Sequence, residues 1–467
     1  MYRLHKMIYR VMPDGTEKQI NPFTGREVWT IPGRSKKPVY NSFKTAPREI
    51  EIQHPEKYCN FCAANYKNTP PEKARLMKTD HGYEFLTRLD PERIFSEEAA
   101  FRRIPNLFEI VTSDYWKKNY NYKLDGVNKE WKQRYLSSEE GFRHVMGIID
   151  LKLKLSGLTP GQIHDKPVEE KVELANAFFC GGHELIVACR HLKAKAKYDT
   201  DLCSSGELTQ EEHFHYFKFT IEAMEDIYAQ NRYVRYISIF QNWLRDAGAS
   251  FDHLHKQLVA LDEWGTSVEQ ELALVQAHPN IYNDMAANFA CYNNLVIAEN
   301  DHAMAFVDVG HVHPTLVIYS KSEHLRPNEH TSEELRGFSD LVHACHAAMG
   351  NAISCNEEWY YVPRDAVIPM PWHILIKWRV NTPAGFEGGT KIYINPMGLT
   401  DLRDIMVTRL YELRDKKIID GFKIAEECPV RPNSLRYNNR AGYTPAMNAN
   451  TSYTQFLDQP LIGTGQL

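Results

Sequence analysis

The sequence predicts an α+β protein built from two copies of one unit. In the first copy, residues 181–191 alternate as a strand, a capping box at 209–212 opens a helix to about residue 230, and strands follow at 236–240 and 252–260. The same order recurs at 313–324, 331–348, 358–362 and 372–378. Because order and type agree over about 70 residues per copy, the pattern predicts a duplicated half.

Composition excludes several classes of protein. The 467 residues are enough for two or three domains, and 43% of them are hydrophobic, so a large core can form. A formal net charge of −5 gives no electrostatic reason to expect a nucleic-acid partner. No run of 18 apolar residues occurs, so we expect no membrane span. The first residues lack a signal-peptide core, and the nine cysteines are mostly isolated, which together predict a cytoplasmic protein.

The stretch from Tyr236 to Trp264 carries the strongest chemical signal. A β-branched and aromatic run leads through Asn242 to a small-residue turn at 246–250, and a second strand follows. On that strand, alternation places His253, His255 and Gln257 on one face. Two imidazoles and an amide on one strand face are better suited to contact a reacting phosphate than to pack in a hydrophobic core. A neutral imidazole is a good nucleophile near pH 7.

This stretch resembles the galactose-1-phosphate uridylyltransferase branch of the histidine-triad (HIT) superfamily, including its ADP-glucose phosphorylase relatives. The family's Phe-x-Asn strand, Gly-x-Ser turn and His-x-His-x-Gln strand correspond to Phe240 with Asn242, Gly248 with Ser250, and residues 253–257. The resemblance implies duplicated HIT-like halves, with antiparallel sheets and packed helices. Small HIT hydrolases have a third His where this chain has Gln257, so the resemblance implies transfer rather than hydrolysis.

The resemblance also implies a reaction. His255 would attack the α-phosphorus of a nucleoside diphosphate sugar and release sugar 1-phosphate, leaving a covalent His-nucleotide. Phosphate or another sugar 1-phosphate would then accept the nucleotide, while Gln257 and Ser250 donate hydrogen bonds to the phosphate oxygens. Two alternatives stay open. One is a zinc-stabilised nucleotide-binding protein without activity, because Lys256 could disable the site. The other is a dinucleoside polyphosphate phosphorylase or hydrolase.

A Cys-x-x-Cys pair, Cys59 and Cys62, could by itself be a redox pair, half of a metal site or a chance occurrence. In the family, a strand that begins Gly-x-His ends in a His that ligates zinc, and His191 stands at that place here. With His253, the pair would complete a Cys2His2 set. Such a closed set of ligands indicates structural rather than catalytic zinc.

Further segments resemble substrate-binding parts of the family. Arg34 lies in a loop similar to the uridylyltransferase opening, and Asn106 follows a displaced counterpart of the Asn-x-(Phe/Tyr)-Pro segment. Residues 384–396 closely resemble a segment of ADP-glucose phosphorylases. The substrate-binding residues implied in this way are Arg34, Asn106, Asn242, Glu387, Gly388, Gly389 and Thr390.

The expected organisation has three parts. The first HIT-like half spans 1–275, with a helical insertion at about 117–180; the second spans 276–431; and a polar tail spans 432–467. In the second half Leu375 stands where the nucleophilic His would be, so we expect only the first half to react. A homodimer is a further expectation. The sequence leaves the nucleobase, the sugar and the acceptor open.

Overall fold

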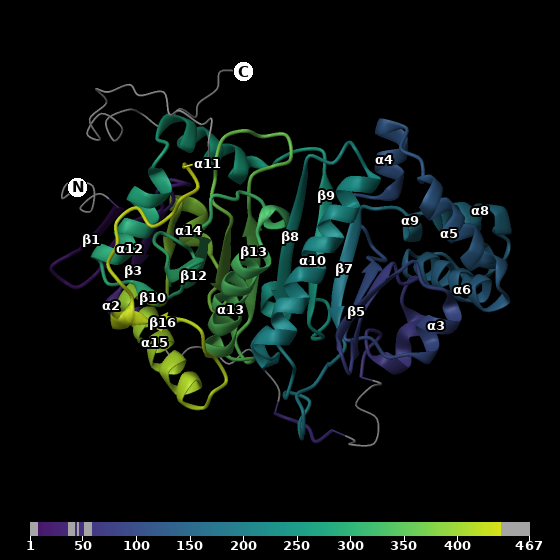
Figure 1. Cartoon of the computed structure of the whole chain (residues 1–467), viewed down its shortest axis with the longest axis horizontal. Coiled ribbons are helices and arrows are strands. Elements are labelled where there is room, and N and C mark those ends of the chain that lie inside the picture. The colour runs from purple at the N-terminus through teal and green to yellow at the C-terminus, as the bar shows by residue number, and fades with distance from the viewer. Residues whose placement is uncertain (1–7, 36–42, 44–45, 51–57, 440–467) are drawn as a thin grey trace.

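The computed structural model describes residues 8–35, 43, 46–50 and 58–439. Its centre is a 12-stranded sheet in which all neighbouring strands are antiparallel (Figure 1). The predicted α+β class is confirmed. From one edge to the other the strands are β16 (Lys423–Ile424), β10 (Val296–Glu299), β11 (Ala303–Val307), β12 (Thr315–Ser320), β14 (His373–Trp378), β13 (Cys355–Tyr360), β8 (Tyr236–Trp243), β9 (His255–Leu261), β7 (His183–Ala188), β6 (Phe101–Pro105), β4 (Ala74–Thr79) and β5 (Gly82–Thr87).

The strand order is symmetric about the contact between β8 and β13. Going outward, one side runs β8, β9, β7, β6 and the other runs β13, β14, β12, β11. At the contact itself, Asn242 pairs with Asn356. Each half alone would end in an open edge, so joining β8 to β13 makes one continuous sheet. The strand order therefore agrees with the duplication that the sequence predicts.

Two long helices cover one face of this sheet, side by side in Figure 1: α10 (Gln210–Gln230) and α13 (Ser332–Met349). Both begin at the predicted capping boxes. Thr209 accepts from the Glu212 N–H and Thr331 from the Glu334 N–H, while each Glu accepts from the backbone of its Thr. The two helices end at or within one residue of the predicted positions.

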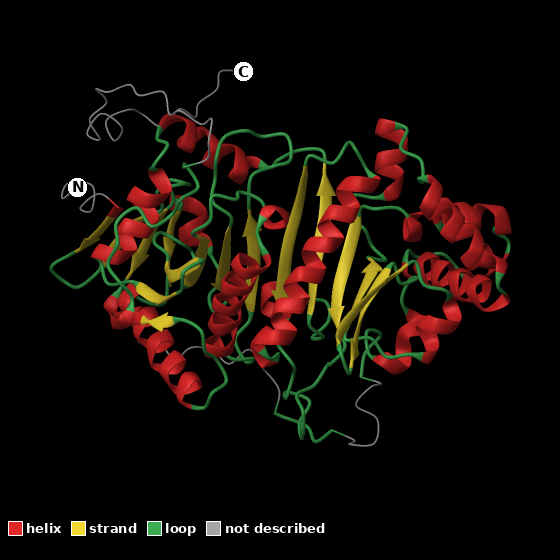
Figure 2. Ribbon diagram, in the orientation of Figure 1, coloured by secondary structure: helices red, strands yellow, loops and turns green. Residues whose placement is uncertain are grey.

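The predicted helical insertion forms a separate layer at one end of the molecule (Figure 2). It packs with α3 (Pro91–Ser96) around a second core that includes Trp131, Tyr135 and Phe178. Its N-terminal helix begins at Ser113, four residues before the predicted boundary of 117. Its helices are α4 (Ser113–Tyr120), α5 (Gly126–Ser137), α6 (Glu139–Leu155), α7 (Pro160–His164), α8 (Val168–Leu174) and α9 (Asn176–Phe179).

A four-stranded sheet lies at the other end of the molecule, with strand order β1 (Tyr9–Val11), β2 (Glu17–Ile20), β3 (Glu27–Thr30) and β15 (Ile392–Ile394). β15 pairs with β3 in parallel, so the 384–396 segment lies against the N-terminal segment. In the turn between β2 and β3, Asn21 packs directly on Gly310, where a Cβ would clash with the Asn21 nitrogen. The φ of Gly310, +74°, also favours glycine. The nearby helices are α2 (Pro32–Ser35), α11 (Thr266–Ala277), α12 (Asn288–Tyr292), α14 (Gly385–Thr390) and α15 (Leu399–Asp415).

The start of the predicted polar tail packs against the core. Leu435 and Tyr437 are buried, and the Tyr437 hydroxyl donates to the Pro279 carbonyl. Residues 440–467 of that tail, and the basic residues 36–37 after Arg34, lie outside the described residues. Within the described residues, every helix is too short or too polar to cross a membrane.

Candidate functional site

Strand β9 carries the predicted nucleophile in the middle of the large sheet. His255 pairs with Val187 of β7, and Gln257 pairs with Leu185. The strand begins at His255, so His253 lies just before it, although the sequence predicted one strand over 252–260. Alternation puts His255 and Gln257 on the face opposite the one covered by α10.

His255 is held as a neutral imidazole in one tautomer. Its Nδ1 lies 2.7 Å from the carbonyl oxygen of His253, and a carbonyl only accepts, so Nδ1 carries the proton. The Nε2 atom therefore keeps its lone pair. Burial lowers the pKa of His255 to about 4, and the residue is only 5% exposed. The Phe61 ring packs edge-on against it at 5.5 Å between centroids.

Two further predicted residues meet beside this strand. Gln257 Oε1 lies 3.0 Å from His183 Nε2, and Asn106 Nδ2 lies 3.1 Å from the same nitrogen. The sequence motif contains His183, but only strand pairing reveals its position. His183 pairs with Val259, two residues beyond Gln257, and therefore shares its face. The structure thus groups Asn106, His183 and Gln257 on the face that carries His255.

Asn242 and Ser250 lie on the neighbouring strand and the turn after it. Phe240 pairs with Gln257, so Asn242, two residues on, shares that face. Its Oδ1 accepts from Asn356 Nδ2 at 2.7 Å, which also donates to the Ala247 carbonyl and so fixes the turn. Ser250 is exposed on that turn.

Four residues form a cluster that could hold a metal ion: Cys59, Cys62, His191 and His253, whose ligand atoms all lie within 4.8 Å of one another. Cys59 Sγ is 3.3 Å from His253 Nδ1, and Cys62 Sγ is 3.4 Å from His191 Nδ1. His253 Nε2 donates to the Ala188 carbonyl at 2.6 Å, which leaves its Nδ1 lone pair facing the thiols. The hydrogen bond from Cys59 lowers the pKa of Cys62. Two thiols and two imidazoles at these distances fit a tetrahedral site.

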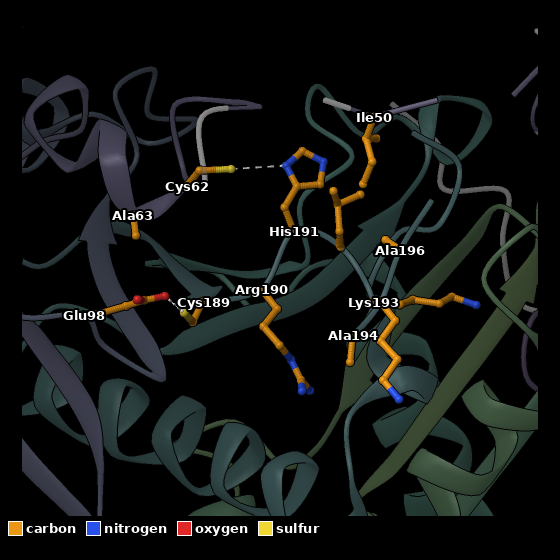
Figure 3. A pocket seen from close by; sticks show the side chains of 12 residues that line it. Ile50, Cys62, Ala63, Glu98, Cys189, Arg190, His191, Lys193, Ala194 and Ala196 are labelled. Atoms are coloured by element: carbon orange, nitrogen blue, oxygen red, sulfur yellow. Dashed lines mark hydrogen bonds between the residues drawn. The ribbon is translucent and has the colours of Figure 1, made fainter. Parts of the chain in front are cut away.

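The metal cluster borders a pocket of about 330 Å³ (Figure 3). In Figure 3, Cys62 and His191 point toward each other at its rim. Three cationic residues line it, Arg190, Lys193 and Lys195, and the first two are paired with Glu212 and Glu207. His255 does not line this pocket, so the pocket is separate from the predicted reaction centre.

The remaining predicted substrate residues lie elsewhere in the chain. Arg34 is on α2 and residues 387–390 are on or near α14, both beside the four-stranded sheet (Figure 1). The pKa of Glu387 is lowered, first by the Ala384 N–H and to a smaller extent by the charge of Arg34. The side chains of Glu387 and Arg34 are therefore close enough to interact electrostatically. β9 lies in the middle of the 12-stranded sheet, away from this end of the molecule (Figure 1). A Cβ on Gly388 or Gly389 would meet no atom within 4 Å.

Lys256 does not face the reaction centre. It is fully buried on the opposite face of β9, with its Nζ 2.5 Å from Glu357 Oε1 of β13. Glu357 Oε2 also accepts from His346 Nε2 at 2.8 Å. Strand alternation turns Lys256 toward the helices, away from the face that carries His255. It therefore gives no reason for a disabled site.

The Lys256–Glu357 pair joins the two halves, and its loss should be costly. We expect Lys256→Met to lower the free energy of unfolding by about 3–5 kcal/mol, because it leaves a buried carboxylate uncompensated. Adding Glu357→Gln to Lys256→Met should restore a large part of the lost free energy of unfolding, because the buried carboxylate is then replaced by a neutral amide. Urea unfolding would measure both, with Lys117→Met as control, since Lys117 makes only an exposed pair with Glu173. Equal effects of the Lys256 and Lys117 variants would contradict this account.

The second half has a histidine, His373, whose local geometry resembles that of His255. His373 is the first residue of β14, pairs with Tyr319 as His255 pairs with Val187, and places Nδ1 2.9 Å from the carbonyl two residues before it. The sequence comparison of the two copies places Leu375 at the position of the nucleophilic His. Leu375 lies two residues further along β14, on the same strand face as His373, so alternation alone does not distinguish the two residues. His373 is enclosed: its ring stacks on Tyr319 and Tyr360, and its Nε2 lies 3.7 Å from Glu271 Oε2.

Glu271 should make stability depend on pH. Burial raises its pKa to about 7, so between about pH 4.5 and 7 the folded protein holds a proton that the unfolded chain has lost. The free energy of unfolding should therefore fall as pH rises through this range, by up to about 3 kcal/mol. Glu271→Gln, which still accepts from the Tyr282 hydroxyl, should remove that fall. Unfolding of both proteins at pH 5 and pH 8 tests this, and a pH-independent difference between them would contradict it.

The fold defines the class: an α+β protein with one continuous antiparallel sheet whose strand order is symmetric about the contact between β8 and β13. The chain belongs to the family described as Domain of unknown function (DUF4921), whose model matches residues 12–437. No curated protein sequence matches the chain.

Two solved structures are similar to this chain in fold. One is an ADP-glucose phosphorylase from Arabidopsis thaliana with bound ADP-glucose, at 16% identity and a TM-score of 0.53, with 84% of this chain and 98% of that chain covered. The other is a GalT-like protein from Arabidopsis thaliana, at 17% identity and a TM-score of 0.51, with the same coverage. At these identities the likeness establishes the fold.

Proposed function

We propose that the protein is a nucleotidyltransferase acting on nucleoside diphosphate sugars and sugar 1-phosphates. The observation that carries the proposal is His255, buried and neutral, with Nδ1–H bound to the His253 carbonyl and Nε2 available on the face shared with Gln257. The fold similarity to an ADP-glucose phosphorylase supports this reaction class. An ADP-glucose phosphorylase-like activity and a hexose-1-phosphate uridylyltransferase-like activity differ in the nucleobase of the nucleotide sugar and in the acceptor, so a test with different substrates distinguishes them.

The proposed reaction has two displacements. In the first, the Nε2 lone pair forms a bond to the α-phosphorus, and the bond from that phosphorus to the bridging oxygen breaks, so sugar 1-phosphate leaves with the electron pair. In the second, an oxygen of phosphate or of another sugar 1-phosphate attacks, and the P–N bond breaks. The His253 carbonyl stabilises the positive charge on the imidazole between the two steps, because it accepts the Nδ1 proton.

Gln257 decides between transfer and hydrolysis in this scheme. Its amide offers hydrogen bonds to the non-bridging oxygens but is not a proton donor at neutral pH. The covalent His-nucleotide should therefore persist in water until a phosphorylated acceptor enters. Ser250, Asn106 and Asn242 would contribute further hydrogen bonds to the substrate.

The metal implied by the four-residue cluster is zinc in a structural role. Cys59, Cys62, His191 and His253 would fill all four positions and leave none for substrate. When bound, the ion would supply folding free energy and join the N-terminal segment to the strand that carries His255. His253 then serves both the metal site and the nucleophile, through its ring and its carbonyl respectively.

Arg34 and residues 387–390 could contribute to this reaction only from a second copy of the chain, because within one chain they lie far from β9. A homodimer would allow that arrangement. Among the alternatives, the inactive nucleotide-binding protein loses its motivation with the burial of Lys256. No structural observation favours a dinucleoside polyphosphate substrate over a nucleotide sugar.

The experiment that tests the proposal is intact-mass analysis after incubation with a panel of nucleotide sugars. We expect one substrate to add one nucleoside monophosphate to the chain. The isolated adduct is then offered water, inorganic phosphate and sugar 1-phosphates, and we expect an acceptor to remove the nucleotide much faster than water does. No adduct with any nucleotide sugar would refute the nucleotidyltransferase. Rapid hydrolysis unaffected by acceptors would make the protein a hydrolase.

A further inference from the structure

His183 makes a chain of hydrogen bonds that the proposed reaction has not used. It is the first residue of β7, is 3% exposed, and lies beside Gln257. The backbone N–H of Ile110 points at His183 Nδ1 at 3.1 Å. On the other side of the ring, Nε2 is 3.0 Å from Gln257 Oε1.

The fixed backbone donor determines the direction of the hydrogen bond between His183 and Gln257. Because the Ile110 N–H can only donate, Nδ1 accepts and the ring proton lies on Nε2. The Nε2–H therefore needs an acceptor. The oxygen of Asn106 already accepts from the Phe108 N–H. Asn106 Nδ2, 3.1 Å from His183 Nε2, is a donor and cannot accept the ring proton, so the acceptor is the Gln257 oxygen. The Gln257 amide is thereby held with its oxygen toward His183 and its NH₂ group turned away.

We propose that His183 is a positioning residue that fixes the orientation of the Gln257 amide, so that its NH₂ group donates to the phosphate attacked by His255. An amide that could rotate would present its oxygen to an anionic phosphate half of the time, which would repel rather than stabilise it. This inference rests on the proposed function. It adds a residue that touches no substrate and acts through Gln257.

His183 is suited to a constant role across physiological pH. Burial lowers its pKa, so the ring stays neutral and remains a donor at Nε2 only. Its backbone carbonyl also accepts from the Asn106 N–H at 2.9 Å, which ties the ring to the loop after β6. His183 could therefore also act by holding this loop in place, and the test must separate that structural role from the positioning of Gln257.

Two substitutions separate these roles. His183→Gln carries an amide nitrogen at about the place of Nε2 and can still donate to Gln257, but it offers Ile110 no acceptor. His183→Asn carries an oxygen at about the place of Nδ1 and can still accept from Ile110, but its donor to Gln257 is lost. We expect His183→Asn to slow adduct formation about tenfold, the factor for losing roughly one hydrogen bond. His183→Gln should stay within about threefold of the unmutated protein. The reverse order would refute the positioning role.

A Gln257→Ala background provides the second test. If His183 acts through Gln257, adding His183→Asn to Gln257→Ala should slow adduct formation no further. A full additional tenfold loss would show that His183 acts through the loop instead. A third readout needs no activity: in protein labelled with ¹⁵N-histidine, the His183 ring should show the Nε2–H tautomer at pH 7 to 8, and an Nδ1–H tautomer would overturn the inference. Failure of the unmutated protein to form any adduct would instead refute the proposed function itself.

Discussion

His255→Asn should abolish the nucleotidyl adduct and all exchange of labelled sugar 1-phosphate into nucleotide sugar. The side-chain nitrogen of Asn lies near the place of Nδ1 and can still donate to the His253 carbonyl, so the start of β9 should keep its conformation. What is lost is the Nε2 lone pair, and removal of a covalent nucleophile costs on the order of 10⁴-fold or more in rate. Adduct formation followed by intact mass, and exchange followed by radiolabel, measure the effect.

The matched control is His373→Asn. His373 is the first residue of β14 and makes the same Nδ1 contact to a carbonyl as His255, but its Nε2 faces Glu271 and its ring lies among tyrosines. We expect this variant to keep adduct formation, apart from any effect of lowered stability measured in parallel by urea unfolding. Retention of exchange by His255→Asn, or its loss only in His373→Asn, would remove His255 from the proposed role.

Local signals predicted the elements well because they arise from neighbours in the sequence. Each capping box is closed by a Thr and a Glu three residues apart, so Thr209 and Thr331 mark helix starts without any tertiary information. Strand alternation likewise assigned faces correctly, and Lys256 lies on the face opposite to His255. The Cys2His2 set required the family resemblance, because His191 and His253 are far from the Cys pair in the sequence.

What the sequence could not provide was which residues meet across strands. His183 reaches Gln257 only because β7 pairs with β9 in one register, and register is set by the whole sheet. The same limit applies to His373 and Leu375: both face the same side of β14, so alternation alone does not decide which of them corresponds to His255. Lys256 could be assigned a face from alternation but not a partner, since Glu357 is 101 residues away.

Removal of the metal should have the second large effect. Purified protein should contain close to one zinc per chain, bound by the four-residue cluster. These ligands come from three places: the segment before the 3₁₀ helix Ala63–Asn68, the loop after β7, and the residues just before β9. No such site exists in an unfolded chain, so the binding free energy, on the order of 10 kcal/mol, adds to the stability of the fold.

Chelation, or Cys59→Ser, should therefore lower the free energy of unfolding by several kcal/mol and also slow adduct formation. The second effect follows because the His253 ring binds the metal while its carbonyl accepts the Nδ1–H of His255, so freeing the ring loosens the nucleophile. Cys428→Ser is the matched control, since Cys428 is only partly buried and donates to the Lys423 carbonyl outside the cluster. Elemental analysis and urea unfolding measure the outcome. Metal-free protein in which Cys59 and Cys62 form a disulfide would replace the metal site with a redox pair.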